Sequence, residues 1–156
     1  GLQVPQGCIQ RMPRTAGHPD CRPMSWDQLR EMQRGGMEIG SHGVDHRMLA
    51  KLPRESMTAE VLGSKDALER ELGVPVQVIS YPVGGLDAFD HDTVEAVRGA
   101  GFRLACSYMA GVGRLGPRTR FSLPRLPVER HMDMPWFKAM MAMPELFTYA
   151  SRQRTS

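Results

Sequence analysis

The sequence predicts an α/β domain, because helical and extended segments alternate along most of its length. Segments with apolar residues at helical spacing are each followed by a short run that is apolar or rich in β-branched residues. With 41% hydrophobic and 24% charged residues, the 156-residue chain has the composition of a globular protein with one core. Such alternation is typical of βαβ units around a parallel sheet.

The first helix is predicted over residues 25–34, and the first strand over residues 37–40. Ser25 is a good N-cap residue, and apolar residues recur on one face of the helical segment. Gly35 and Gly36 end the helix. The apolar run after these glycines is the predicted strand.

The second unit repeats this scheme with a helix over residues 55–72 and a strand over residues 76–79. Ser56 or Thr58 is the expected N-cap, and Gly73 ends the helix. The β-branched run that follows is typical of a buried strand. The apolar stripe of the helix consists of Val61, Leu62, Leu68 and Leu72.

The third unit is a helix over residues 90–99 followed by a strand over residues 102–106. Val94 and Val97 are expected to face the core from this helix. Together with the preceding strand, the unit has the spacing of a βαβ motif.

An extended edge segment and a closing helix complete the chain. Residues 121–128 contain Pro124 and Pro127, and prolines in a strand favour an edge position. Asp133 is the expected N-cap of the last helix, with Pro135 in its first turn. The apolar face of this helix, which we expect to pack into the core, consists of Trp136, Phe137, Met140 and Met141.

Charge and hydropathy argue against nucleic-acid binding and against a membrane span. The formal net charge is +3, and the 20 Lys and Arg residues are spread along the chain without a basic block. No apolar run approaches the roughly 20 residues of a membrane helix, and the first residues lack the pattern of a signal peptide. We therefore expect a soluble protein, cytoplasmic by default, although a signal could stand ahead of Gly1. Composition does not predict the oligomeric state.

Two histidines four residues apart, His42 and His46, follow the predicted strand over residues 37–40. On a helical turn, residues i and i+4 lie about 5–6 Å apart at Cβ, so both imidazoles can reach one zinc ion. Such a pair also arises by chance, but this one lies at the carboxyl end of a strand, where α/β proteins place their active sites. The pattern predicts two metal ligands.

The three cysteines, Cys8, Cys21 and Cys106, form neither a disulfide framework nor a Cys-x-x-Cys pair, so reduced structural thiols are expected. A zinc finger in which Cys8 and Cys21 join the histidine pair is an alternative. Twelve residues separate these two cysteines, however, where zinc fingers have two to four.

The residues around the histidine pair resemble a known family. Residues 24–32 together with Gly40-Ser41-His42-x-x-x-His46 resemble the second motif of the polysaccharide deacetylases. Tyr81-Pro82-Val83-Gly84 resembles their third motif, and the helix predicted over residues 55–72 fits between the two motifs.

The resemblance implies a partial, distorted (β/α) barrel of the polysaccharide deacetylase type, as in the carbohydrate esterases related to the nodulation deacetylase. It covers residues 24–128 of a single domain, residues 1–156, and leaves residues 129–156 as a C-terminal helical segment. A complete barrel needs about 200 residues or more. The family's early Phe-Asp-Asp-Gly motif has no counterpart, because the sequence contains no Asp-Asp pair, and it begins at Gly1 without a methionine. We therefore expect an N-terminally incomplete domain that lacks its first strand or strands.

The resemblance also implies a chemistry. In this family a divalent metal ion polarises the carbonyl of an N-acetyl group and lowers the pKa of a bound water, and acetate leaves from the sugar amine. His42 and His46 correspond to the two histidine ligands, and imidazole nitrogens suit zinc better than calcium or magnesium. The first motif would supply a further ligand and the general base, so the base and the general acid stay unassigned. Asp20 is a candidate substitute carboxylate.

The third motif implies that the backbone N–H of Val83 stabilises the oxyanion. The residues that it assigns to substrate binding are Tyr81, Pro82 and Gly84. Ser80 stands where many relatives carry an arginine. Without the resemblance, the same four residues equally indicate a tight turn that needs proline and glycine for its conformation alone.

The other polar residues near these motifs receive plainer interpretations. Ser41 and Asp45 either orient the imidazoles or belong to a solvated turn. His18, His91 and His131 are expected to be surface residues, and His131 is not assigned as the general acid.

Two functions follow from these observations. The first is a metal-dependent hydrolase, with zinc as the expected metal, that cleaves the C–N amide bond of N-acetyl groups on a polysaccharide. The second is a catalytically inactive remnant that acts as a carbohydrate-binding or interaction module, because the paired carboxylates are missing. The expected partner of the enzyme is an N-acetylated glycan.

Overall fold

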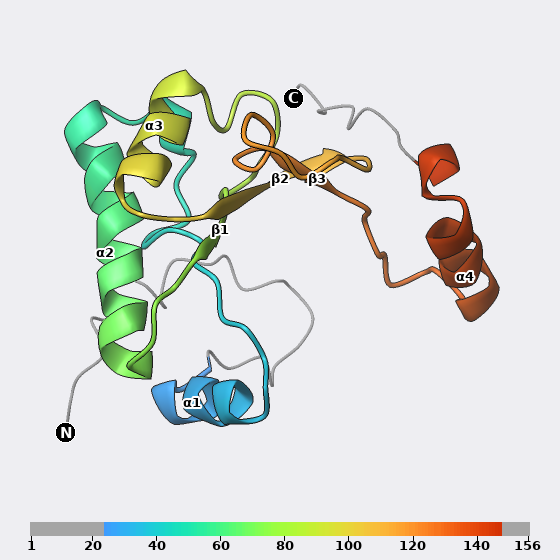
Figure 1. Ribbon diagram of the computed structural model, residues 1–156, viewed down its shortest axis with the longest axis horizontal. Helices are drawn as coiled ribbons and strands as arrows, with labels where there is room; N and C mark the ends of the chain where they lie inside the picture. Colours follow the sequence, from blue (N-terminus) through green and yellow to red (C-terminus); the bar gives the residue numbers. More distant parts are fainter. Residues whose placement is uncertain (1–23, 148–156) are drawn as a thin grey trace.

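The computed structural model describes residues 24–147, which form a three-stranded parallel sheet flanked by helices (Figure 1). The strands lie in the order β1 (Val78–Ser80), β2 (Leu104–Ala110), β3 (Leu123–Arg125). Both neighbouring pairs run parallel, with Ser80 opposite Cys106. The carboxyl ends of the strands therefore meet at one edge of the sheet. The predicted α/β class is confirmed.

The first predicted helix is confirmed as α1 (Trp26–Arg34). The backbone N–H of Gln28 donates to Ser25 Oγ at 3.3 Å, and the Ser25 N–H donates to Gln28 Oε1 at 2.8 Å. This reciprocal pair is a capping box, which satisfies two backbone donors at the start of the helix.

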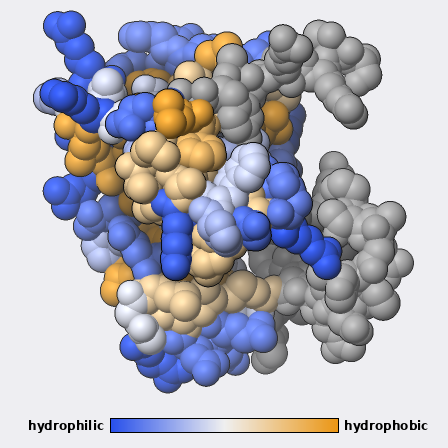
Figure 2. Space-filling model, turned by 90° about the vertical axis from the view of Figure 1, so that its right-hand side faces the viewer, coloured by the Kyte–Doolittle hydropathy of each residue, from blue (hydrophilic) through white to orange (hydrophobic). Residues whose placement is uncertain are grey.

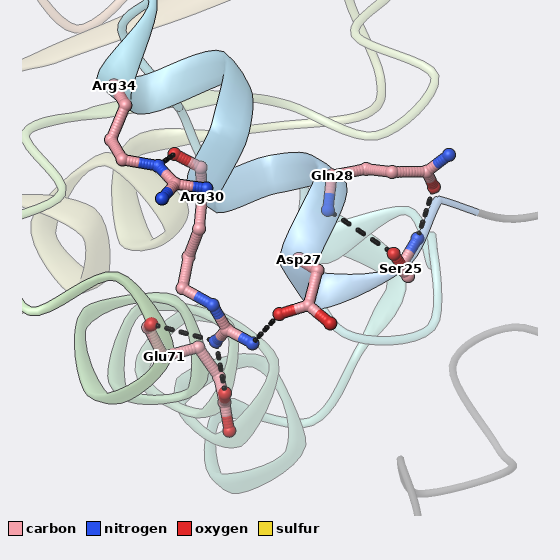
Figure 3. Close-up of polar contacts among 6 residues, drawn as sticks. All are labelled: Ser25, Asp27, Gln28, Arg30, Arg34 and Glu71. Atoms are coloured by element: carbon pink, nitrogen blue, oxygen red, sulfur yellow. Dashed lines mark hydrogen bonds and ion pairs between the residues drawn. The ribbon is translucent and has the colours of Figure 1, made fainter.

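Arg30 ties α1 to the end of α2 (Arg54–Leu72). Its guanidinium donates to Asp27 Oδ1 at 2.8 Å, and to the side chain and the carbonyl of Glu71 at 3.1 and 3.2 Å (Figure 3). Gln33 adds a hydrogen bond of 3.4 Å to the carbonyl of Leu72. Because exposed ion pairs add little stability, these contacts chiefly set the orientation of α1 against α2.

Residues 37–40 do not form the predicted strand. The first residue of this region to pair with the sheet is Ser41, in an isolated parallel bridge beside β1. The Ser41 N–H donates to the carbonyl of Val78 at 2.8 Å, and the Ser80 N–H donates to the carbonyl of Ser41 at 2.9 Å. The apolar run is exposed or half-buried until it reaches the sheet. Its apolar pattern therefore does not indicate sheet pairing, which begins only at Ser41.

The second predicted helix is confirmed as α2, but its predicted cap is wrong. The N-cap residue is Pro53, without a side-chain hydrogen bond, and the Thr58 hydroxyl instead donates to the carbonyl of Arg54 at 2.9 Å. Gly73, at φ 70°, ends the helix as predicted. Leu62 is 39% exposed, whereas the other members of the apolar stripe pack in or against the core: Val61, Leu68 and Leu72.

The third predicted unit is confirmed, with shifted strand boundaries. A short helix, η1 (Leu49–Lys51), precedes α2, and α3 (His91–Gly99) connects β1 to β2. The carboxylate of Asp90 caps α3 by accepting the Thr93 N–H at 2.9 Å and the Thr93 hydroxyl at 2.7 Å. Val97 is fully buried and Val94 packs against the core, as predicted. β2 continues four residues beyond the predicted end at residue 106.

The core lies between the sheet and the two helices α2 and α3, and Tyr81 is among its largest fully buried side chains. The Tyr81 ring stacks on Phe89 with centroids 4.3 Å apart, and its hydroxyl donates to the carbonyl of Phe121 at 2.8 Å. Burial raises the pKa of Tyr81, so the phenol keeps the proton that it donates. The buried cluster consists of Leu49, Met57, Val61, Val76, Ile79, Tyr81, Val97, Phe102, Ala105 and Phe121.

The closing elements are the edge strand β3, α4 (Met134–Ala142) and η2 (Pro144–Phe147). β3 lies within the predicted extended segment over residues 121–128 and occupies the predicted edge position. Asp133 caps α4 by accepting the Trp136 N–H at 2.8 Å. Pro135 lies in the first turn, as predicted.

The predicted core packing of α4 is wrong for most of its apolar face. Met140 is buried, but Trp136 is 51% and Met141 60% exposed, and Phe137 is exposed as well. An apolar pattern identifies such a face but not what covers it, and α4 lies apart from the sheet (Figure 1). Apolar side chains show as tan and orange atoms on this side of the molecule (Figure 2). None of the helices within residues 24–147 is long and apolar enough to cross a lipid bilayer.

The loop after β1 passes unusually close to β2 at Gly84. The Tyr108 N–H donates to the carbonyl of Gly84 at 2.7 Å. Gly84 has φ 65°, and a Cβ at this position would lie 2.7 Å from the Tyr108 nitrogen. Glycine is therefore required here both for conformation and for space.

We predict that Asp90→Ala lowers the free energy of unfolding by about 0.5–2 kcal/mol at pH 7, because the cap of α3 is lost. Hydrogen bonds from the backbone and side chain of Thr93 hold the pKa of Asp90 below its ordinary value of 3.8. The contribution of a carboxylate with a depressed pKa is complete above the ordinary value and disappears as the pH falls through the folded-state pKa. Urea unfolding should therefore show that the difference between wild type and variant narrows below about pH 4. Asp66→Ala, in the exposed middle of α2, is the control and should cause no loss. A difference that stays constant down to pH 2 would contradict the cap assignment.

We predict that Gly84→Ala destabilises the protein by clearly more than Gly73→Ala. Both glycines have positive φ, 65° and 70°, so both substitutions carry the cost of a left-handed alanine, about 1–2 kcal/mol. A Cβ on Gly73 meets nothing within 4 Å, whereas a Cβ on Gly84 meets backbone of β2. Urea unfolding of the two variants isolates the steric cost. Equal losses would show that the loop and β2 are not in contact in solution.

Candidate active site

A cavity lies at the edge of the sheet where the parallel strands end. It measures about 450 Å³ and is lined by residues from the strand ends and from the loop after Ser41: His42, His46, Ser80, Tyr81, Val83, Tyr108 and Arg125. This is the edge at which α/β proteins bind ligands and place catalytic groups. The structure therefore brings both predicted metal ligands together with two residues of the predicted third motif.

The two histidines lie side by side on a bent loop rather than on the helical turn expected from their spacing. Residues 42–46 contain no helical turn. Gly43 and His46 adopt positive φ, 76° and 56°, on either side of a bend at residues 44–45. The two imidazole centroids are 4.8 Å apart, with 70° between the ring planes, and both residues are exposed to solvent. The loop achieves the proximity that the spacing predicted, by a different backbone path.

Glu60 of α2 holds this bend, and the sequence analysis missed it. Its side chain is buried, and Oε2 accepts the N–H of Val44 at 2.8 Å and the N–H of Asp45 at 3.0 Å. Burial of a carboxylate is costly unless it accepts hydrogen bonds, and these two amides supply them. The feature of the sequence that could have indicated this role is the charge of Glu60, which stands next to Val61 on the face of α2 that packs against the core.

The ring of His42 is oriented by the main chain of β1. Nδ1 of His42 lies 2.7 Å from the carbonyl oxygen of Ser80. Because a carbonyl only accepts, Nδ1 carries the proton in the neutral ring and Nε2 keeps its lone pair. Desolvation by the surrounding protein lowers the pKa of His42, the Ser80 carbonyl opposes this, and the neighbouring His46 and Arg125 lower it further. The imidazole is thus held in the neutral form that a metal ligand needs.

Ser41 and Asp45 do not contact the imidazoles, so the Ser80 carbonyl takes the orienting role proposed for them. The Ser41 hydroxyl is buried and lies 2.7 Å from the hydroxyl of Ser64. The Asp45 side chain is exposed on the bend. Asp45 therefore belongs to a solvated turn, and Ser41 fastens the loop to α2.

The described residues include both predicted metal ligands but no complete ligand set. Within residues 24–147, no group of three or more His, Cys, Asp or Glu side chains could hold a metal ion together. The cavity lining includes no carboxylate. Asp20, and the cysteines of the zinc-finger alternative, Cys8 and Cys21, lie outside the described residues. Cys106 is a free thiol in β2.

Val83 stands at the centre of a tight turn at the cavity wall. The Gly84 N–H donates to the carbonyl of Pro82 at 2.7 Å, which is the i→i+2 bond of a γ-turn. Val83 has φ 63°, a strained value for a β-branched residue, and its side chain is 47% exposed. Its own N–H makes no hydrogen bond to any residue between 24 and 147.

The remaining residues of the third motif lie mostly beneath the cavity surface. Tyr81 is 1% exposed, and its hydroxyl is already bonded within the core. Pro82 and Gly84 are buried and do not line the cavity. Their assignment to substrate binding stays a prediction, and the turn conformation gives proline and glycine a structural role.

Two lining residues from the neighbouring strands were not identified from the sequence. Tyr108 follows the buried part of β2, and Arg125 ends β3 beside Pro124. Both lie outside the two motifs that carry the family resemblance, so no sequence pattern marked them. Their positions at the ends of parallel strands are the only signal, and strand ends are hard to place from sequence.

The other histidines take no part in this cavity. His91 has an 85% exposed side chain and lies 3.7 Å from Asp92 on α3. His131 is exposed after β3, as predicted, and His18 lies outside the described residues.

Comparison with known proteins finds polysaccharide deacetylases among those that this chain resembles. The chain is 28% identical over 85 residues to YxkH of Bacillus subtilis strain 168, a protein named for the polysaccharide deacetylases, and the match covers 54% of this chain and 29% of YxkH. The fold resembles that of the deacetylase PplD of Streptococcus pyogenes, solved in complex with acetate. The TM-score is 0.70 at 22% identity, covering 79% of this chain and 53% of PplD. IcaB of Ammonifex degensii matches with a TM-score of 0.61 at 26% identity, covering 76% of this chain and 53% of IcaB.

These similarities identify the partial parallel sheet as part of a barrel of the polysaccharide deacetylase type. The chain spans about a third of the curated relative and about half of the two solved structures. The family model for polysaccharide deacetylases matches residues 9–105, more than half of the 156 residues. The chain therefore belongs to the polysaccharide deacetylase family.

Proposed function

We propose that the protein containing this chain is a metal-dependent hydrolase that removes N-acetyl groups from a polysaccharide. Membership of the family supports the reaction class. The observation that carries the metal assignment is the pair of imidazoles in the cavity, with His42 Nδ1 engaged by a carbonyl and Nε2 left to bind.

The donor geometry suits one shared divalent ion. With metal–nitrogen bonds of about 2.0–2.1 Å and a tetrahedral angle, two coordinating imidazoles have centroids about 5 Å apart. The observed 4.8 Å agrees with this value. Nitrogen donors favour zinc over calcium or magnesium. A third protein ligand must come from outside residues 24–147, and the family match, which begins at residue 9, includes Asp20.

Residues of this chain would hold the metal ion and stabilise the charge that develops on the acetamide. When bound, a divalent cation of this kind supplies Lewis acidity and makes hydroxide available near neutral pH. His42 and His46 would hold it at the cavity wall. The N–H of Val83, at the centre of its γ-turn, would donate to the oxygen of the acetamide as negative charge develops there. The general base would come from outside the described lining, which contains no carboxylate.

We predict that His42→Ala lowers zinc affinity by at least about 100-fold, since changes in the shell around a ligand alone cost 10- to 100-fold. Acetate release from N-acetylglucosamine oligomers by the zinc-loaded protein should fall to background. Isothermal titration with zinc and an acetate assay measure the two effects. His91→Ala, which removes an exposed histidine outside the cavity, is the matched control.

Two outcomes would contradict this assignment in different ways. Equal zinc affinity in His42→Ala and His91→Ala would exclude His42 as a ligand. Oligomer binding by the zinc-loaded protein without acetate release would instead support the alternative function, a carbohydrate-binding module without catalysis.

We predict that Glu60→Leu lowers zinc affinity by about 10- to 100-fold while Glu60→Gln keeps it within a few-fold of wild type. The leucine removes the acceptor for the Val44 and Asp45 amides, whereas the glutamine retains one carbonyl oxygen that can accept both. Visible absorption of the cobalt-loaded protein reports ligand geometry directly. If both variants lost the wild-type cobalt spectrum equally, the prediction would be wrong. The negative charge of Glu60, and not only an oxygen that accepts the two N–H groups, would then be required to hold the site.

A further inference from the structure

Besides the two imidazoles, the cavity is lined by a second polar group, the guanidinium of Arg125. This side chain belongs to β3 and contacts the neighbouring strand β2. Arg125, at the end of β3, donates from Nε to the carbonyl oxygen of Ser107 in β2 at 2.7 Å. Its guanidinium carbon lies 5.4 Å from the centroid of the Tyr108 ring. One hydrogen bond and one cation–π contact thus hold the head group, and both supports come from the neighbouring strand.

Most N–H donors of the Arg125 guanidinium have no acceptor among residues 24–147. The hydrogen bond to Ser107 uses Nε alone. Within residues 24–147, Arg125 takes part in no ion pair with a carboxylate. Arg30, by contrast, directs its Nη groups to Asp27 and Glu71 (Figure 3). Arg125 lines the cavity, and its Nη1 and Nη2 groups make no hydrogen bond or ion pair with any residue between 24 and 147.

This arrangement suits a carboxylate on the ligand. A guanidinium presents parallel N–H donors in a fixed fork, the geometry that binds a carboxylate through two hydrogen bonds. The hydrogen bond and ring contact already restrict the side chain, so binding costs less conformational entropy than it does for a free surface arginine. Tyr108, 54% exposed beside it, adds an aromatic wall of the kind that lines ligand sites.

We propose that Arg125 binds a carboxylate of the glycan substrate, so that the protein selects N-acetylated glycans in which an acidic sugar lies at or next to the acetylated residue. This assignment rests on the proposed function, because the same cavity must place the acetamide beside His42 and His46. Released acetate carries the same chemical group and is the competing source of a carboxylate at Arg125.

The test compares two oligosaccharides of equal length, one of N-acetylglucosamine alone and one in which N-acetylglucosamine alternates with glucuronic acid. Isothermal titration of the zinc-loaded full chain should show 10- to 100-fold tighter binding of the acidic oligomer, the range of a charge-assisted hydrogen bond. Arg125→Gln should abolish this preference, and Arg125→Lys should retain part of it, because lysine keeps the charge but not the fork. Arg118→Gln, an exposed arginine that does not line the cavity, should leave the preference unchanged.

Acetate is titrated in parallel to separate the two carboxylate sources. If Arg125→Gln weakened acetate binding but left the preference between the oligomers intact, Arg125 would bind the product and the proposal would be overturned. Equal affinity of the wild type for both oligomers would overturn it as well, whether or not acetate is released. Preferential binding of the acidic oligomer without acetate release would support the carboxylate site and count against the hydrolase.

Discussion

The site depends on one parallel bridge, in which Ser41 joins the sheet beside β1. Two main-chain hydrogen bonds, to Val78 and from Ser80, bring residue 41 to the edge where the strands end. Gly40 permits this approach, because a Cβ there would lie 3.2 Å from the Val78 carbonyl oxygen. The next residue, His42, is then close enough for Nδ1 to reach the Ser80 carbonyl at 2.7 Å. The same backbone contact that extends the sheet therefore selects the tautomer of the His42 imidazole.

Strained backbone and a buried carboxylate both lie at or next to this cavity. Within residues 24–147, the non-glycine residues with positive φ are His46 and Val83, and both line it. Strained backbone persists where surrounding structure holds it, and it is frequent at functional sites. Here the support is visible for each: Glu60 accepts from the bend between the histidines, and the close contact of Gly84 with β2 holds the γ-turn.

The sequence predicted the helices and the histidine pair better than it predicted the geometry and the contacts around that pair. Apolar spacing, the Ser25 cap and the terminal glycines are local signals, so α1, α2 and α3 appear near their predicted bounds even though the cap predicted for α2 was wrong. The strand over residues 37–40 and the core packing of α4 were wrong because pairing and coverage depend on distant segments. The histidine pair was identified by spacing, yet a bent loop rather than a helix brings the rings together. Glu60 and Arg125 were missed because their roles arise from contacts with main chain far away in sequence.

We propose that His42 and His46 bind one metal ion, with Nε2 of His42 as donor. Long-range ¹H–¹⁵N spectra of the imidazoles, recorded while zinc is added to the full chain, test it most directly. The nitrogen signals of His42 and His46 should shift together, Nδ1 of His42 should stay protonated, and His91 and His131 should not respond. Zinc-dependent shifts confined to other residues, or a His42 ring protonated on Nε2, would contradict it.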